Sequence, residues 1–136
     1  ISDTLSVWCV GSSLVKRAFI AARDRPGGIN LGLQRNGIEI WWQGYGGMKL
    51  DDLPKKLRTL VKIGPSPYAI LIHCGGNDIG RKPVGDLYHM AKRILENIHH
   101  QFPSIVLIWS GILPRLQWRY SQNIEAMNKC RKRLNS

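Results

Sequence analysis

Three short segments of the chain carry residues suited to acyl-transfer chemistry. Residues 11–14 (Gly-Ser-Ser-Leu) place serine hydroxyls where an apolar run gives way to a helix-like stretch, and free N–H groups at a helix start favour developing negative charge. Residues 44–47 (Gly-Tyr-Gly-Gly) let backbone N–H groups approach a ligand closely. Residues 75–78 (Gly-Gly-Asn-Asp) hold the Asn77 amide, a hydrogen-bond donor.

Each segment also has a plainer interpretation when it is taken alone. Ser12 or Ser13 could simply cap a helix, the glycines could serve a loop that needs positive φ, and Asn77 could belong to an Asn-Asp turn. A phosphate-binding loop is excluded, because the Gly75-x4-Gly80 spacing is followed by Arg-Lys rather than Lys-Ser or Lys-Thr. The chemistry therefore depends on whether the three segments meet.

The pattern of short apolar runs and amphipathic stretches predicts how they meet. We expect strands at 4–10, 38–42, 68–73 and 105–109, and helices at 14–23, 50–61, 83–99 and 121–134. In the last helix, Ile124, Met127 and Leu134 are the expected core contacts. This alternation predicts an α/β fold, a three-layer α/β/α sandwich around a parallel sheet. Ligands bind such sheets at the carboxyl ends of the strands, where all three segments fall.

Taken together, the segments resemble the first three sequence blocks of the SGNH (GDSL-like) hydrolases, in the same order. The family's Gly-Asp-Ser-Leu block is similar to residues 11–14, which implies Ser13 as the nucleophile. Its second block resembles residues 44–47 with Asp51-Asp52-Leu53, which implies that Gly47 supplies an oxyanion N–H. Its Gly-x-Asn-Asp block implies Asn77 as the side-chain oxyanion donor. The resemblance also implies a flavodoxin-like sheet, and the chain further resembles esterase-like domains encoded by vertebrate retroelements.

Two departures from the family pattern concern the catalytic machinery. Ser12 stands where the family has aspartate, and no Asp-x-x-His, the block that supplies the general base and its orienting acid, occurs in the sequence. His73 is predicted to be a core or rim residue, and His89, His99 and His100 to be surface or packing residues. We therefore expect residues 1–136 to be one domain that lacks its C-terminal catalytic block.

These features predict a serine hydrolase of carboxylic esters with short acyl groups such as acetyl, acting on a small ester or acylated substrate. No metal or organic cofactor is implied. The alternative is a non-catalytic SGNH-like module that binds nucleic acid, lipid or protein through a basic surface.

The basic surface rests on 20 Lys and Arg residues against 9 acids, a net charge of +11. Most of the cations are spread along the chain as pairs, which favours solvated faces over one specific site. The exception is residues 129–133 (Lys-Cys-Arg-Lys-Arg), in which the candidate nucleic-acid contacts are Lys129, Arg131, Lys132 and Arg133.

Cysteine usage and hydropathy bear on the compartment. The three cysteines, Cys9, Cys74 and Cys130, are odd in number and show neither Cys-x-x-Cys nor metal-ligand spacing. A reducing, intracellular compartment, cytoplasmic or nuclear, is expected. No apolar run approaches the roughly 20 residues of a transmembrane helix.

Overall fold

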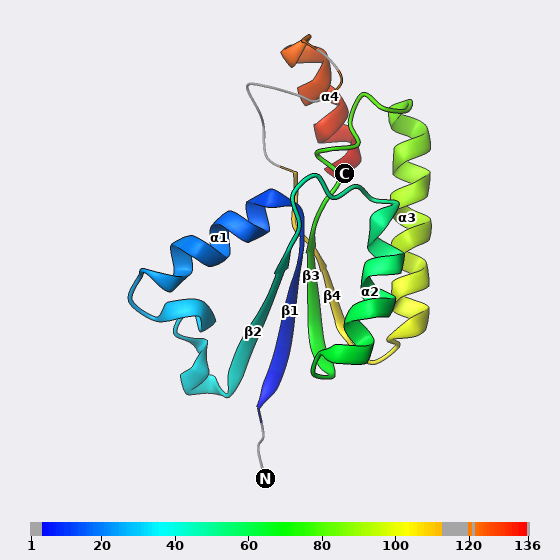
Figure 1. The fold of residues 1–136 in the computed structure, drawn as a ribbon. Helices are drawn as coiled ribbons and strands as arrows, with labels where there is room; N and C mark the ends of the chain where they lie inside the picture. Colours follow the sequence, from blue (N-terminus) through cyan, green and yellow to red (C-terminus); the bar gives the residue numbers. More distant parts are fainter. Residues whose placement is uncertain (1–3, 113–119, 121, 136) are drawn as a thin grey trace.

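The computed structural model of this protein, described for residues 4–112, 120 and 122–135, is built around a parallel four-stranded sheet (Figure 1). The strands are β1 (Leu5–Gly11), β2 (Ile38–Gly44), β3 (Pro67–His73) and β4 (Val106–Trp109). Their order across the sheet is β2-β1-β3-β4, and every neighbouring pair is parallel. The predicted α/β fold with a parallel sheet is confirmed.

The helices lie on both faces of the sheet. Helix α1 (Ser13–Arg23) lies on one face, and α2 (Asp52–Ile63) and α3 (Val84–Gln101) lie on the other (Figure 1). Two short 3₁₀ turns, η1 (Gly28–Asn30) and η2 (Leu33–Asn36), connect α1 to β2. Neither turn was predicted from the sequence.

The main core lies between the sheet and the pair α2 and α3. Alternate residues of β1 and β3 point into it, and Trp8, Val10, Ile70 and Ile72 have no exposed surface. The apolar stripes of the two helices complete this core, with Leu53, Leu57, Leu60, Leu87 and Ile94 among its members. Each fully buried aliphatic side chain stabilises the fold by about 1.5–3 kcal/mol, so this layer fixes the sheet beneath the loops.

An aromatic cluster closes the core near the amino ends of the strands. The buried Trp8 ring lies 5.2 Å from the Trp41 ring and 6.1 Å from the Phe102 ring, measured between centroids. Its indole N–H donates a hydrogen bond of 3.0 Å to the Pro65 carbonyl, which satisfies its one polar group. The end of the sheet opposite the candidate site is thereby held by large rigid rings.

The face that carries α1 is only partly covered by the described residues. Helix α1 lies over β1 and β2, whereas Val106 and Ile108 of β4 remain 46% and 41% exposed. Ile108 pairs with Leu71, which in turn pairs with Cys9, so these side chains share the α1 face. The helix layer is therefore thinner on this side than on the other.

Helix α4 (Ile124–Asn135) lies beyond the carboxyl ends of the strands and differs from expectation at its start (Figure 1). It begins at Ile124, and Ser121 lies outside the described residues. Met127 and Leu134 are buried as predicted, but Ile124 is 41% exposed, so its assignment to the core is wrong. Met127 packs directly on Gly80, and the first turn of the helix, with Ile124, remains open to solvent.

Candidate active site

The carboxyl ends of β1, β2 and β3 lie side by side, because their registers match at the last residues. Gly11 is paired with Gly44 on one side and with His73 on the other. The Tyr45 N–H donates to the Gly11 carbonyl (2.8 Å), and the Ser12 N–H donates to the His73 carbonyl (3.2 Å). The loops that follow these strands therefore start from one edge, and Ser13, Gly47 and Asn77 all lie at that edge.

The turn from β1 into α1 presents Ser13 and buries Ser12. Ser12 is the residue before the helix and only 3% exposed, and its side chain makes no capping hydrogen bond. Its carbonyl accepts the N–H groups of Val15 and Lys16, which begins the helix. Ser13 is the first helical residue and is half-buried, so its hydroxyl stands beside first-turn N–H groups that have no partner within the helix.

Arg17 is a residue near the nucleophile candidate that the sequence analysis missed. Its guanidinium Nη2 donates to Ser13 Oγ at 3.4 Å, from one turn further along α1. The i, i+4 spacing on a helix was the available signal. A guanidinium beside a hydroxyl stabilises negative charge that develops on or near that oxygen.

The second loop is held against α1 by Gly44. A Cβ atom at this position would fall 2.3 Å from the Lys16 backbone nitrogen, so only glycine allows the loop to approach the first turn this closely. Three residues later Gly47 has φ of +73°, a conformation that L side chains rarely adopt. Glycine at these two positions sets the path of the backbone on which the candidate oxyanion N–H lies.

Asn77 joins the second loop to the third. Its side chain is 7% exposed, and its Nδ2 donates to the Met48 carbonyl at 3.1 Å, directly after Gly47. An amide nitrogen carries two N–H groups, and this bond uses one of them. The Cys74 thiol approaches the same carbonyl at 3.8 Å.

Asp78 is the buried anchor of these loops, a role that the sequence analysis did not assign. Its side chain has no exposed surface and accepts hydrogen bonds from the Leu50 N–H (2.9 Å) and from Arg81 Nη2 (2.7 Å). Arg81 also reaches Asp51 at 3.3 Å. Burial raises the pKa of Asp78 above its usual value, although the hydrogen bonds from Arg81 and Leu50 lower it in part. Burial therefore outweighs the two partners.

His73 is the histidine at this edge of the sheet. It ends β3 and is half-buried, and its Nδ1 lies 3.0 Å from Ser110 Oγ, just past β4. His89, His99 and His100 are exposed on α3, as predicted for surface residues. The hydrogen bond described for Ser13 Oγ comes from Arg17 and not from a histidine.

The cysteine thiols near the site are poorly suited to nucleophilic attack. Burial raises the pKa of Cys9 to about 11 and, with a smaller contribution from nearby carboxylates, that of Cys74 to about 12. Both remain protonated at neutral pH, and the thiolate is the reactive form. All three cysteines are free thiols. Of the nucleophilic side chains at this edge, the serines are the better candidates.

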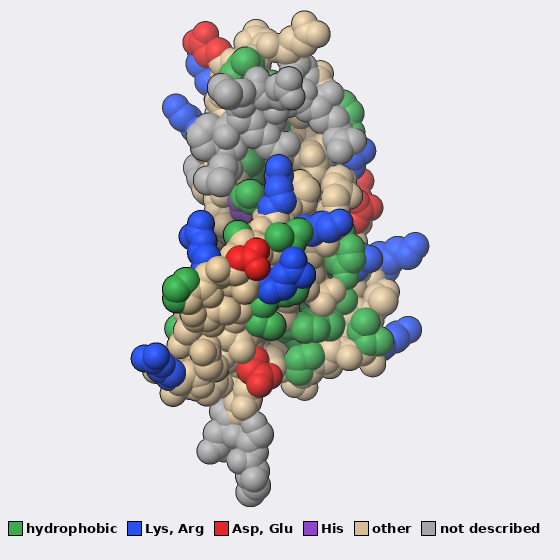
Figure 2. Space-filling view, turned by 60° about the vertical axis from the view of Figure 1, so that its left-hand side comes forward, with side chains coloured by type: hydrophobic (Ala, Val, Ile, Leu, Met, Phe, Trp, Pro, Cys, Tyr) green, Lys and Arg blue, Asp and Glu red, His purple; other side chains and the backbone are tan. Residues whose placement is uncertain are grey.

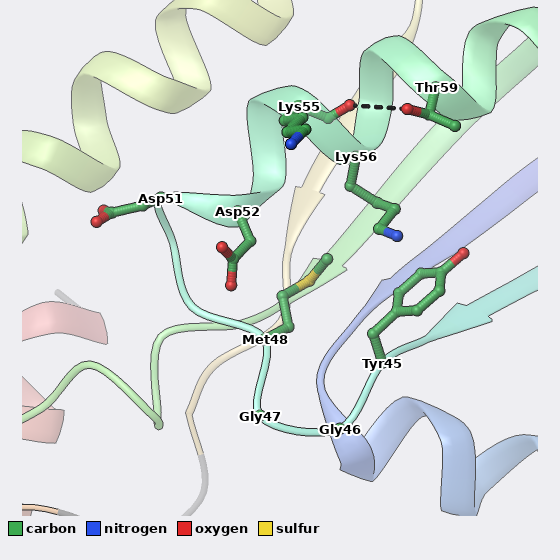
Figure 3. Close-up of a pocket in the computed structure, with 9 residues that line it drawn as sticks. All are labelled: Tyr45, Gly46, Gly47, Met48, Asp51, Asp52, Lys55, Lys56 and Thr59. Carbon is green, nitrogen blue, oxygen red and sulfur yellow. Dashed lines mark hydrogen bonds between the residues drawn. The ribbon is translucent and has the colours of Figure 1, made fainter.

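Two cavities adjoin the candidate site. One, of about 380 Å³, lies between the Tyr45–Met48 loop and the start of α2 (Figure 3). The other, of about 190 Å³, lies between α1 and the sheet, with Leu14, His73 and Ser110 among its lining residues. No cluster of His, Cys, Asp or Glu among the described residues is arranged to hold a metal ion. In the same part of the chain, no helix is long and apolar enough to cross a membrane.

The four candidate nucleic-acid contacts lie on α4 but are not equivalent. Lys129 is 3.8 Å from Glu125, and Arg131 donates to the Ile112 carbonyl and to Asn128 at 3.2 Å each. Lys132 and Arg133 are exposed. Figure 2 shows Lys and Arg side chains scattered over the face in view, between hydrophobic and other side chains. The described part of that face carries no continuous basic stripe.

Comparisons with known proteins identify the fold. No protein-family model and no curated protein matches the sequence. Among solved structures, the chain is similar to AlinE4, an SGNH-hydrolase family esterase (TM-score 0.64, 17% identity, 100% of this chain and 75% of that one). It is similar to a lipolytic G-D-S-L family protein from Veillonella parvula (TM-score 0.65, 14% identity, 97% of this chain and 69% of that one). It is also similar to the acetyl xylan esterase AlAXEase (TM-score 0.61, 18% identity, 96% of this chain and 72% of that one). The chain therefore has the fold of the SGNH hydrolases.

Proposed function

We propose that this protein is the nucleophile-bearing part of a carboxylic ester hydrolase, with Ser13 as nucleophile. The observation that carries this proposal is the convergence of three strand-end loops, linked by the bond from Asn77 to the Met48 carbonyl. That bond sets an amide donor next to the Gly47 backbone, in a fold shared with esterases.

The proposed reaction begins with attack of Ser13 Oγ on the ester carbonyl. A tetrahedral intermediate forms, and the negative charge on its oxygen is held by the N–H groups of Ser13 and Gly47 and by the Asn77 amide. The start of α1 and the Arg17 guanidinium add favourable electrostatics at the same place. The base takes the Ser13 hydroxyl proton during attack and returns it to the departing oxygen, so collapse of the intermediate expels the alcohol and leaves an acyl-Ser13 ester. Water then hydrolyses this ester to the acid and free Ser13.

The base for this reaction is proposed to come from an Asp-x-x-His block carried by a longer chain. A serine hydroxyl is a weak nucleophile at neutral pH without a base. Oxyanion donors alone retain part of the rate enhancement when triad members are missing. Short acyl groups such as acetyl are the proposed substrates, in keeping with the acetyl xylan esterase among the similar structures.

Hydrolysis of 4-nitrophenyl acetate tests this proposal. The 136-residue chain should turn the ester over slowly at most, and a chain extended through an Asp-x-x-His block should be active. Ser13→Ala in the active chain should abolish turnover, whereas Ser12→Ala, the matched control one residue away, should not. Loss of activity on Ser12→Ala with Ser13→Ala intact would show that the nucleophile assignment is wrong by one residue.

The alternative, a non-catalytic module that binds nucleic acid, lipid or protein, draws its support from the net charge of +11. The way the basic residues are distributed argues against this alternative, because two of the four candidate contacts on α4 have partners within the chain. Arg131 is used to hold α4 against Ile112, and Lys129 is paired with Glu125. An extended chain that is inert towards esters but binds nucleic acid tightly would favour this alternative.

A further inference from the structure

The cavity of about 380 Å³ lies directly against the loop that carries the candidate oxyanion N–H. One wall is formed by Tyr45, Gly46, Gly47 and Met48, and the other by the first turns of α2 (Figure 3). Its volume falls within the range of small-molecule sites, about 300–1,000 Å³. Because Gly47 lines this cavity, one small molecule can place one of its groups in the cavity and another beside the Gly47 N–H.

The two carboxylates that border this cavity form no ion pair with its lysines among the described residues. Asp51 is 3.3 Å from the Arg81 guanidinium, and Figure 3 shows its side chain pointing away from the other lining residues. Asp52 accepts the Lys49 N–H at 2.9 Å, a bond that closes the turn before α2. Both carboxylates keep their negative charge, but each is held by a partner other than the lysines of the cavity.

The positively charged groups that line the cavity are the ammonium groups of Lys55 and Lys56. None of the ion pairs between described residues involves Lys55 or Lys56. Lys56 reaches over the Tyr45 ring, with its Nζ 3.9 Å from the ring centroid (Figure 3). The ring holds this ammonium at the loop without neutralising it, and an ammonium offers three hydrogen-bond donors.

We propose that this cavity binds an anionic group, a phosphate or a carboxylate, carried by the ester substrate, with Lys55 and Lys56 as its donors. The ester part of this inference rests on the proposed function, because it places the reacting carbonyl at Gly47. The anion site itself does not depend on catalysis. Its consequence is a preference for esters whose non-reacting part is negatively charged.

Titration of the 136-residue chain with inorganic phosphate tests the anion site, with the amide NMR signals of Gly46 and Gly47 as the readout. Phosphate should shift both signals, and Lys55→Gln or Lys56→Gln should each raise the Kd by up to roughly fivefold, the range for an exposed charge pair. Lys62→Gln, which removes the same charge from the far end of α2, should leave the Kd unchanged. Unshifted glycine signals, or an equal effect of Lys62→Gln, would overturn the site.

The substrate preference is tested by comparing kcat/KM for 4-nitrophenyl succinate, which is anionic, with that for 4-nitrophenyl acetate in the active chain. The preference for the succinate ester should fall in the Lys55→Gln and Lys56→Gln variants and persist in Lys62→Gln. An unchanged ratio, with phosphate binding still dependent on the two lysines, would overturn the substrate assignment alone. Failure of the proposed function is distinguishable, because Ser13→Ala would then retain full turnover while phosphate binding stays intact.

Discussion

Replacement of the buried Asp78 tests whether this side chain holds the two candidate oxyanion loops together. Asp78→Ala removes the acceptor of the Leu50 N–H, and Leu50 is only 1% exposed. A buried donor left without a partner costs about 1–3 kcal/mol. Arg81 loses its closest carboxylate as well, although Asp51 remains at 3.3 Å. We therefore expect Asp78→Ala to lower the free energy of unfolding by at least about 1–3 kcal/mol.

Asp78→Asn is the matched variant, since it keeps an oxygen acceptor for Leu50 and removes only the charge. Burial raises the pKa of Asp78, so the ionised carboxylate is less favourable in the folded chain than in the unfolded one. The neutral amide avoids that cost and offsets part of what is lost at Arg81. The expected order of stability at neutral pH places Asp78→Asn close to the unmodified chain and well above Asp78→Ala.

The dependence on pH gives the sharper measurement. Because the folded pKa is raised, the contribution of Asp78 to stability is full below its unfolded pKa of about 4 and is lost as pH rises through the folded pKa. Urea unfolding followed by tryptophan fluorescence at several pH values should show the unmodified chain losing stability relative to Asp78→Asn as pH rises. If it gains stability instead, the attraction of Arg81 outweighs burial and the reasoning is wrong.

Three further predictions concern the site and the surface. In the active chain, Asn77→Ala should lower kcat for 4-nitrophenyl acetate by about 10²–10³-fold with little change in KM, and an unaffected kcat would remove Asn77 from the oxyanion hole. Gly44→Ala should destabilise the fold by about 1–3 kcal/mol or more in urea unfolding, because its Cβ would overlap the Lys16 backbone. Gly46→Ala is its control, as nothing lies within 4 Å of that Cβ. Under the nucleic-acid alternative, the affinity should fall steeply as the salt concentration rises, and Lys132→Glu should lower it more than Lys62→Glu; binding that does not depend on salt would contradict that alternative.

The fold could be predicted from the sequence because its signals are local. The strand predicted at 68–73 is observed as Pro67–His73, and the helix predicted at 50–61 is observed as Asp52–Ile63. A continuous apolar run indicates a strand buried on both faces, and its place between helical patterns indicates parallel pairing. The shared edge of the three segments follows from this arrangement.

What could not be predicted depends on partners distant in the chain. The bonds from Leu50 to Asp78 and from His73 to Ser110 join residues far apart in the chain, and periodicity carries no information about them. Ile124 was assigned to the core because it continues the apolar pattern of α4, yet that pattern does not say how far the helix extends past its neighbours. The cavity beside Tyr45 likewise arises only when the second loop folds back against α2.

The position of β1 in the sheet has a consequence for how the chain folds during synthesis. Strand β1 lies between β2 and β3 and is synthesised before both, so its second edge stays unpaired until residues 67–73 have emerged. The hydrogen bond from the Trp8 indole N–H likewise cannot form until Pro65 has been synthesised. Such non-local parallel pairing makes folding slow, and an exposed strand edge favours aggregation. Until β3 has been made, the nascent segment that carries β1 is thus the part of this sheet that a chaperone would protect.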